Sequence, residues 1–193
     1  MSAAEWVLTG ALLLEFGLRL GLEIREARMV HGKFDRFTAF RILPVVNDVF
    51  PAEANFTSDN GGAFVNAHEK AHGELHHGFV RRSLQFGFAL FCALSLGAAG
   101  VYLRFNLLEL LLLFHLIFAV AKIGYHMVCF TEEYEADFLA AKRVQRGVAT
   151  RALEALLVKE FPRTPLFAYV YRTHPTAQMR LDRIVRTCKK SRR

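Results

Sequence analysis

The fold of this 193-residue chain is decided by residues 84–103, which read LQFGFALFCALSLGAAGVYL. These twenty residues carry no charge, whereas Arg81 and Arg82 stand just before them and Arg104 follows directly. A helix of twenty residues rises 1.5 Å per residue, so it is about 30 Å long and matches the hydrocarbon core of a bilayer. The stretch therefore predicts a helix that crosses a membrane.

A second apolar run follows at residues 107–128, and three residues, 104–106, separate the two runs. Its uncharged centre covers residues 110–121, and Glu109 and Lys122 near its ends can extend toward the membrane interfaces. The short connection predicts an antiparallel transmembrane hairpin over residues 84–128. The alternative is a pair of buried helices in a soluble core, because such helices are also apolar on all sides.

The first apolar run, residues 6–22, is interrupted by Glu15 and Arg19, whose spacing allows an ion pair on one helix face. It lacks the basic start and the cleavage site of a signal peptide. We therefore expect residues 1–22 to form a membrane or interfacial helix. The polar stretch that follows contains a possible strand at residues 40–46 and a loop rich in Asn, Asp and Gly at residues 47–62.

After the hairpin, helices are expected at residues 131–146 and 150–160, and a last one begins near His174-Pro175. Pro162 and Pro165 are expected to break the chain between them. The predicted fold is mainly α, an integral-membrane helical protein whose compact zincin-like catalytic domain is split by the hairpin. Four segments result: an N-terminal helix, the first part of the catalytic domain, the hairpin and the second part of the catalytic domain, at residues 1–22, 23–83, 84–128 and 129–193.

The charges indicate how the chain sits in a membrane. Residues 122–193 hold 15 of the 25 Lys and Arg but 7 of the 18 Asp and Glu. Because positive segments stay in the cytoplasm, both polar parts are expected there, in a plasma or inner membrane. The basic C-terminal tail lacks the interleaved aromatic residues of a nucleic-acid site, which favours contact with anionic lipid and no nucleic-acid partner.

Residues 67–72, Ala-His-Glu-Lys-Ala-His, contain the pattern H-E-x-x-H. On a helix this spacing places His68 and His72 on one face with Glu69 beside them, which is typical of a zinc ligand pair with a general base. Such a site needs a third ligand from elsewhere. Glu133 and Asp137 share a helix face after the hairpin, so that one can bind the metal while the other holds a ligand histidine.

These features resemble the HtpX-like and CAAX prenyl protease family of integral-membrane zinc metallopeptidases, the membrane gluzincins. The motif at residues 68–72, the Glu133 to Asp137 segment, and Thr173-His174-Pro175 followed by Arg180 match in order, over about residues 64–184. The resemblance implies one zinc ion per chain, bound by His68, His72 and Glu133.

The resemblance also implies the remaining roles. Glu69 is expected to be the catalytic acid and base, Asp137 to support a ligand, and His174 with Arg180 to complete the site. The implied function is a membrane-bound endopeptidase that cleaves protein or peptide substrates near the cytoplasmic surface through a zinc-activated water. It assigns no residue to substrate binding and no oligomeric state.

Two other functions remain open. His68, His72, His76 and His77 together resemble a histidine box of the membrane di-iron desaturases and hydroxylases, although the remaining histidines stand singly, namely His31, His115, His126 and His174. We expect His76 and His77 instead to form a polar helix end near the interface. A non-catalytic scaffold or sensor that binds zinc for folding is the second alternative, because a metal stabilises a small domain with or without turnover.

Overall fold

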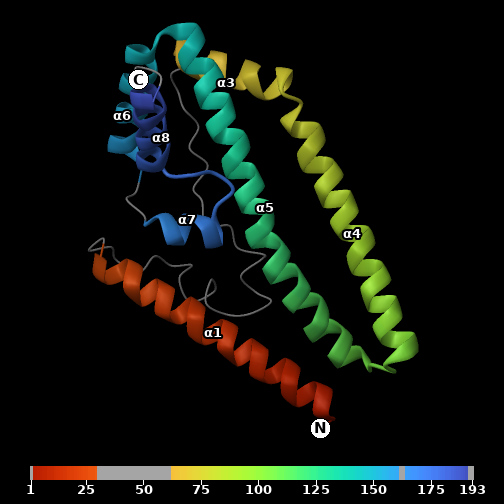
Figure 1. Ribbon diagram of the computed structural model, residues 1–193. Coiled ribbons are helices and arrows are strands. Elements are labelled where there is room, and N and C mark those ends of the chain that lie inside the picture. The colour runs from red at the N-terminus through yellow and green to blue at the C-terminus, as the bar shows by residue number, and fades with distance from the viewer. Residues whose placement is uncertain (1, 30–61, 161–163, 191–193) are drawn as a thin grey trace. The chain divides into compact units, whose positions relative to one another are not determined.

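A computed structural model describes residues 2–29, 62–160 and 164–190, and no strand occurs within these ranges. The possible strand at residues 40–46 lies outside them, as does the predicted loop at residues 47–62 except for its last residue. The prediction of a mainly α fold is confirmed. The helices of the described residues are α1 (Ala3–Met29), α3 (Ala63–Glu74), α4 (His77–Tyr102), α5 (Leu107–Val144), α6 (Arg146–Lys159), α7 (Pro165–Tyr171) and α8 (Ala177–Lys190) (Figure 1).

The chain forms two compact units, each made of two separate segments. The first, called the hairpin unit, comprises Met1–Ala52 and Ser83–Gly124, and the second, called the site unit, comprises Glu53–Arg82 and Tyr125–Arg193. Helices α4 and α5 each contribute residues to both units. The site unit therefore takes its parts from the chain before and after the apolar hairpin.

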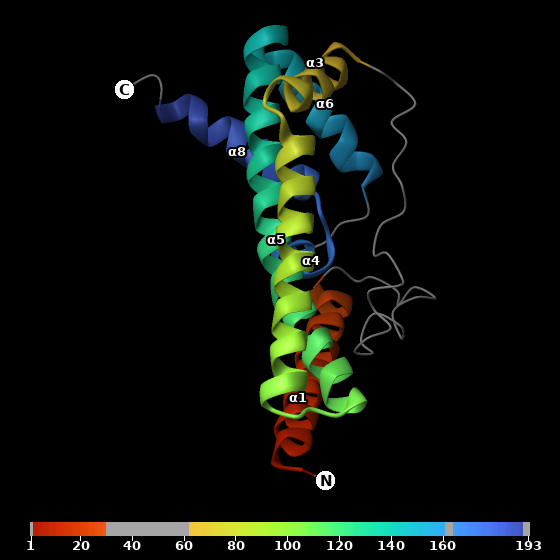
Figure 2. The same ribbon diagram turned by 90° about the vertical axis from the view of Figure 1, so that its right-hand side faces the viewer.

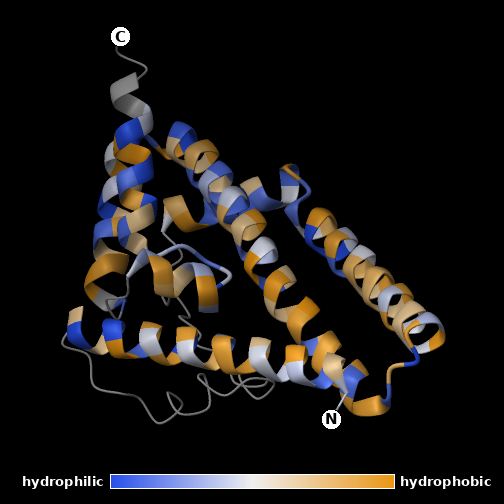
Figure 3. Ribbon diagram, turned by 60° about the horizontal axis from the view of Figure 1, so that its bottom comes forward, coloured by the Kyte–Doolittle hydropathy of each residue, from blue (hydrophilic) through white to orange (hydrophobic). Residues whose placement is uncertain are grey.

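Helices α4 and α5 are long and apolar enough to cross a membrane. In the most apolar window of each helix, 11% of the residues are buried within the structure, which is far less than the core helices of a soluble protein would bury. Figure 3 shows the apolar residues along both helices. The soluble-core alternative is therefore disfavoured.

The turn of the hairpin is built by a reciprocal cap at the start of α5. The Glu109 amide donates to Asn106 Oδ1 at 3.0 Å, and the Asn106 amide donates to Glu109 Oε2 at 2.8 Å. Figure 2 shows α4 and α5 running antiparallel from this turn. Phe88 and Phe118 contact across the hairpin with ring centroids 5.9 Å apart.

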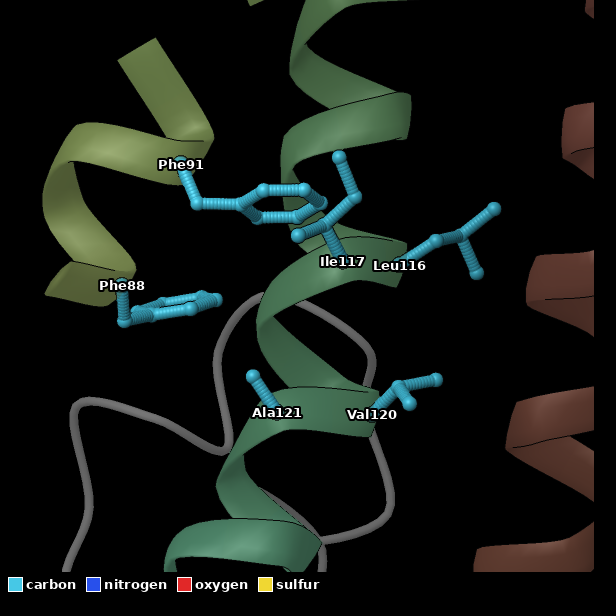
Figure 4. A pocket seen from close by; sticks show the side chains of 6 residues that line it. All are labelled: Phe88, Phe91, Leu116, Ile117, Val120 and Ala121. Atoms are coloured by element: carbon cyan, nitrogen blue, oxygen red, sulfur yellow. The ribbon is translucent and has the colours of Figure 1, made fainter. Parts of the chain in front are cut away.

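An apolar groove lies between the two helices in the hairpin unit. Phe88 and Phe91 project from α4 toward α5, and the lining residues that α5 supplies are Leu116, Ile117, Val120 and Ala121 (Figure 4). Its lining is apolar throughout.

Helix α1 is held to α5 by buried charges. Glu15 accepts a hydrogen bond from Arg19 Nε at 2.7 Å, as the spacing predicts, and its other oxygen lies 2.8 Å from His115 Nε2. Partnering of this kind is what ionisable groups in an apolar environment require. The helix also continues beyond residue 22 to Met29, and Glu23 and Glu26 in this added part are buried.

The site unit has a core that joins four helices. Its fully described apolar cluster is Phe64 from α3, Ala140 from α5, Ala149 and Leu153 from α6, and Ile184 from α8. The small side chains of Ala140 and Ala149 let the helix backbones approach closely. This packing fixes the faces of α3, α5 and α8 that carry the polar residues of the site.

Two expectations about the helices after the hairpin are corrected. Residues 107–144 form one continuous helix, so that the apolar run and the following acidic segment share one axis. Pro165 does not merely interrupt the chain but begins α7, where Thr164 caps the helix by accepting from the Phe167 amide. Proline is tolerated there because backbone amides in the first turn of a helix make no hydrogen bond within the helix, so the missing amide hydrogen of proline costs nothing.

Candidate metal centre

Helix α3 presents the H-E-x-x-H residues as its spacing predicts. His68 is 7% exposed and lies on the buried face with Phe64 and Ala71. Glu69 and Lys70 are exposed. The helix therefore directs imidazoles inward and leaves the Glu69 carboxylate accessible to solvent.

Helix α5 brings Glu133 to the two histidines. One carboxylate oxygen of Glu133 lies 3.3 Å from His68 Nε2, and the other lies 3.3 Å from His72 Nε2. The two Nε2 atoms are 3.0 Å apart. The three side chains offer ligand atoms that all lie within 4.8 Å of one another, and they form a group that can hold a metal ion.

A second carboxylate supports His68 from behind. His68 Nδ1 lies 3.0 Å from Asp137 Oδ1, one helical turn beyond Glu133 on the same face of α5. A histidine that offers its Nε2 lone pair to a metal carries its proton on Nδ1, and a carboxylate there fixes that tautomer. Glu133 therefore faces Nε2 of both His68 and His72. Asp137 faces Nδ1 of His68.

Arg180 from α8 donates two hydrogen bonds to Asp137. Its Nε donates to Asp137 Oδ2 at 2.8 Å and a terminal nitrogen donates to the other oxygen. Arg180 Nη1 is 4.0 Å from Glu133 Oε2, so its direct influence on that ligand is weaker. We expected Arg180 among the catalytic residues; in the structure its hydrogen bonds are with Asp137.

The buried groups shift one another's protonation. Burial alone would raise the pKa of Glu133, but hydrogen bonds from His68 and His72 and the Arg180 charge hold it far below its ordinary value. Burial likewise opposes the ionised form of Asp137, yet the Arg180 guanidinium lowers its pKa. Both carboxylates are thus ionised at neutral pH and available as ligand and acceptor.

His68 responds to the same carboxylates. Burial favours its neutral form, but the hydrogen bonds to Asp137 and Glu133 raise its pKa above the ordinary histidine value. In the absence of a metal, a proton on His68 therefore supplies positive charge next to Glu133, where a metal cation would otherwise lie.

His174 reaches the site from the loop between α7 and α8. Its Nε2 lies 3.4 Å from Glu133 Oε1, and its side chain is 45% exposed. The loop is held from both ends by buried Glu160, which accepts from Arg172 Nη1 and from the Ala177 amide at 2.6 Å. His174 therefore stands at the open side of the group formed by His68, His72 and Glu133.

Two site residues do not stand out in the sequence. Arg81 sits near the start of α4, where its Nε pairs with Glu132 and a terminal nitrogen lies 3.2 Å from Glu133 Oε1. His77, the first residue of α4, is 3% exposed, and its Nδ1 lies 2.7 Å from His72 Nδ1. Burial is also the main cause that lowers the pKa of His77.

These positions correct two expectations. The expectation that His77 belongs to a polar helix end is wrong, because it is buried against His72; His76 beside it is exposed. Arg81 was expected only to flank the apolar segment, but it is also the counter-ion of the buried carboxylates of Glu132 and Glu133. No pattern in the sequence pointed to either contact.

The residues present fit a zinc ion. Ligand atoms around a tetrahedral zinc with bonds of about 2.0–2.1 Å lie about 3.3 Å apart. The separations among His68 Nε2, His72 Nε2 and the Glu133 oxygens are 3.0, 3.3 and 3.3 Å. Two imidazoles and one carboxylate also form the donor set of many catalytic zinc sites, which leaves a fourth position for water.

Within residues 2–29, 62–160 and 164–190, no larger histidine set gathers of the kind that a di-iron centre requires. His115 contacts Glu15, and His126 Nδ1 lies 3.0 Å from the carbonyl oxygen of Tyr169. His115 and His126 thus have partners outside the metal group. This arrangement favours a single three-ligand site.

Comparison with known proteins agrees with this site. The sequence model of peptidase family M48 matches residues 46–187. That range includes every residue of the site, from His68 on α3 to Arg180 on α8. No curated protein and no solved structure matches the chain.

Proposed function

The chain belongs to peptidase family M48, the family of the HtpX and CAAX prenyl proteases, and on this premise we propose that it is a membrane-bound, zinc-dependent endopeptidase. Family membership supports metalloprotease activity in general. The observation that carries the finer proposal is the convergence of His68, His72 and Glu133, whose ligand atoms lie within 4.8 Å of one another. We assign these three residues as the zinc ligands.

When bound, zinc supplies a positive charge that acidifies water and polarises a peptide carbonyl. The ionised Glu133 and the neutral Nε2 atoms of both histidines are the donors that would hold it. Asp137, fixed by Arg180, holds His68 in the tautomer that leaves Nε2 free. The buried surroundings of these donors keep their geometry fixed before substrate arrives.

Glu69 is the acid and base of the proposed reaction. Its carboxylate is exposed on α3 beside His68, and it makes no hydrogen bond or ion pair with any described residue. A carboxylate oxygen of Glu69 takes a proton from the attacking water and returns it to the leaving amine nitrogen. A purely structural metal site has no use for a base at this position, which favours catalysis over a scaffold.

His174 is proposed to stabilise the charge that develops on the carbonyl oxygen. It lies beside Glu133 and is partly exposed, so that it borders the space where substrate would enter. Its ring N–H is suited to donate to an oxyanion, an interaction that in other enzymes lowers the barrier by roughly 3 kcal/mol.

We further propose that α4 and α5 form the transmembrane hairpin and that the site faces the cytoplasm. The length and apolar surface of both helices support the first part. The basic excess after residue 122 supports the second. Substrates are then peptide bonds near the cytoplasmic membrane surface.

The decisive experiment compares the purified full chain with its Glu69→Gln variant. We expect about one zinc per chain in both proteins, determined by elemental analysis, and cleavage of unfolded protein substrates only by the wild type. Two irons per chain would instead identify an oxidase. Zinc without cleavage in either protein would identify a scaffold or sensor.

A further inference from the structure

His77 occupies a position that the proposed chemistry does not use. It is the first residue of α4 and is 3% exposed, and its ring meets that of His72 edge to face, with centroids 4.8 Å apart at 73°. The contact atoms are the two Nδ1 nitrogens, 2.7 Å apart. This distance is that of a short hydrogen bond between the rings.

The junction between α3 and α4 creates this contact. His76 adopts a left-handed conformation with φ 56°, and its carbonyl oxygen accepts from the amides of Phe79 and Val80 at 2.9 and 3.1 Å. The chain therefore bends once between the helices. The bend returns the first side chain of α4 against the last turn of α3, where His72 lies.

A hydrogen bond between two ring nitrogens requires one donor and one acceptor, and only one direction suits the site. His72 directs Nε2 toward His68 and Glu133. With the Nε2 lone pair free for a metal, its proton resides on Nδ1 and is donated to His77 Nδ1. His77 then carries its own proton on Nε2, which is buried without a hydrogen-bond partner among the described residues and lies 3.5 Å from Glu135 Oε2.

We propose that His77 is the positioning residue of His72, whose tautomer and ring orientation it fixes by accepting the Nδ1 hydrogen. This inference rests on the proposed zinc site and adds a residue to it. Each ligand histidine thereby has its own Nδ1 partner, Asp137 for His68 and His77 for His72. The partner of His72 is neutral in this arrangement, so it orients the ring without adding a third buried negative charge.

The test uses zinc affinity of the full chain in detergent, measured by competition with a chromophoric chelator. An Asn side chain places its oxygen where His77 has Nδ1, whereas a Gln side chain places its oxygen near the more distant Nε2 position. We expect His77→Leu and His77→Gln to weaken zinc binding by about 10- to 100-fold, the usual effect of losing such a partner. His77→Asn should retain most of the affinity.

His76→Asn is the matched control, because His76 is exposed and asparagine tolerates its left-handed backbone. It should bind zinc as the wild type does. Thermal melting of the zinc-free proteins reports packing separately, and all four variants should unfold as cooperatively as the wild type.

Two results would overturn the inference while leaving the zinc peptidase in place. One is wild-type zinc affinity in His77→Leu; the other is an equal loss in His77→Leu and His77→Asn, which would assign His77 to packing alone. A wild-type chain that binds no zinc would instead refute the proposed function, and the inference with it.

Discussion

Arg180 and Asp137 form a two-bonded ion pair between α8 and α5, with Arg180 Nε 2.8 Å from Asp137 Oδ2 and a terminal nitrogen on Oδ1. The pair is buried, and Asp137 passes its orientation to His68 Nδ1 at 3.0 Å. A planar guanidinium can hold both carboxylate oxygens at once, which an ammonium group cannot do. The last helix, α8, thus holds the carboxylate that contacts His68 on α3.

This relationship predicts the effect of replacing Arg180. In Arg180→Lys the charge remains but the two-bonded geometry is lost, so we expect zinc affinity to fall about tenfold. Arg180→Met leaves the Asp137 carboxylate buried without its counter-ion, and it should also lower the melting temperature clearly. Arg186→Lys, on an exposed position of α8, is the control and should change neither quantity. Equal behaviour of all three variants would contradict the assigned role.

The low pKa of Asp137 predicts an acid-sensitive fold in the zinc-free protein. A carboxyl whose pKa is depressed by folding contributes stability above its unfolded pKa of about 3.9, and that contribution is lost as the pH falls toward the folded value. The melting temperature of the wild type should therefore fall between about pH 5 and pH 3. In Asp137→Asn, which has no proton to gain there, the fall should be smaller. An unchanged pH profile in the variant would show that other groups control acid unfolding.

Glu133 is predicted to be the third zinc ligand rather than its neighbour Glu132. Glu133→Gln should abolish stoichiometric zinc binding, because a neutral amide is a poor zinc ligand. Glu132→Gln keeps its shape beside Arg81 and should retain nearly one zinc per chain. Elemental analysis after gel filtration measures both, and the reverse pattern would exchange the two assignments.

His174 is predicted to act during the reaction and not in metal binding. His174→Ala should keep zinc and fold but lower kcat by about a hundredfold, with a smaller change in KM. Glu160→Gln, which loosens the loop from Arg172 to Ala177, should reduce kcat in the same direction without touching substrate. Loss of zinc in His174→Ala would make it a ligand, and full activity would limit the catalytic residues to Glu69.

The transmembrane hairpin predicts a defined labelling pattern. In a chain whose three cysteines are replaced by alanine, a cysteine placed at Phe105 should react with a charged maleimide from the outside. A cysteine at Thr164 should react only after the membrane is opened. Labelling of both positions from the same side of intact cells would rule out the spanning hairpin.

The sequence predicted those parts of the site that depend on local periodicity. The four-residue spacings from His68 to His72 and from Glu133 to Asp137 each define one helix face, and each face is found in the structure. The apolar runs likewise predicted two long helices, because length and composition alone decide whether a helix suits a bilayer.

The parts that the sequence did not predict depend on a bend or on the reach of a long side chain. His77 contacts His72 because His76 adopts a positive φ. At a residue other than glycine, no pattern in the sequence predicts this backbone conformation. Arg81 was assigned to the membrane boundary, where positive charge is common, and its reach to Glu132 and Glu133 becomes visible only when α4 and α5 are placed in space. Pro165 was predicted to break the chain, which is the usual effect of proline, but it begins α7 because Thr164 before it caps that helix.

The order of the site residues along the chain has a consequence for biosynthesis. Arg180 follows His68 by 112 positions, and the hairpin lies between them. At about 5–20 residues per second, a ribosome needs on the order of ten seconds to make the intervening chain. During that time the nascent protein already holds Glu69 and two histidines, but it lacks first Glu133 and then Arg180. The residues of the proposed zinc site and the arginine that contacts Asp137 are therefore all present only after the hairpin and most of the following segment have been made.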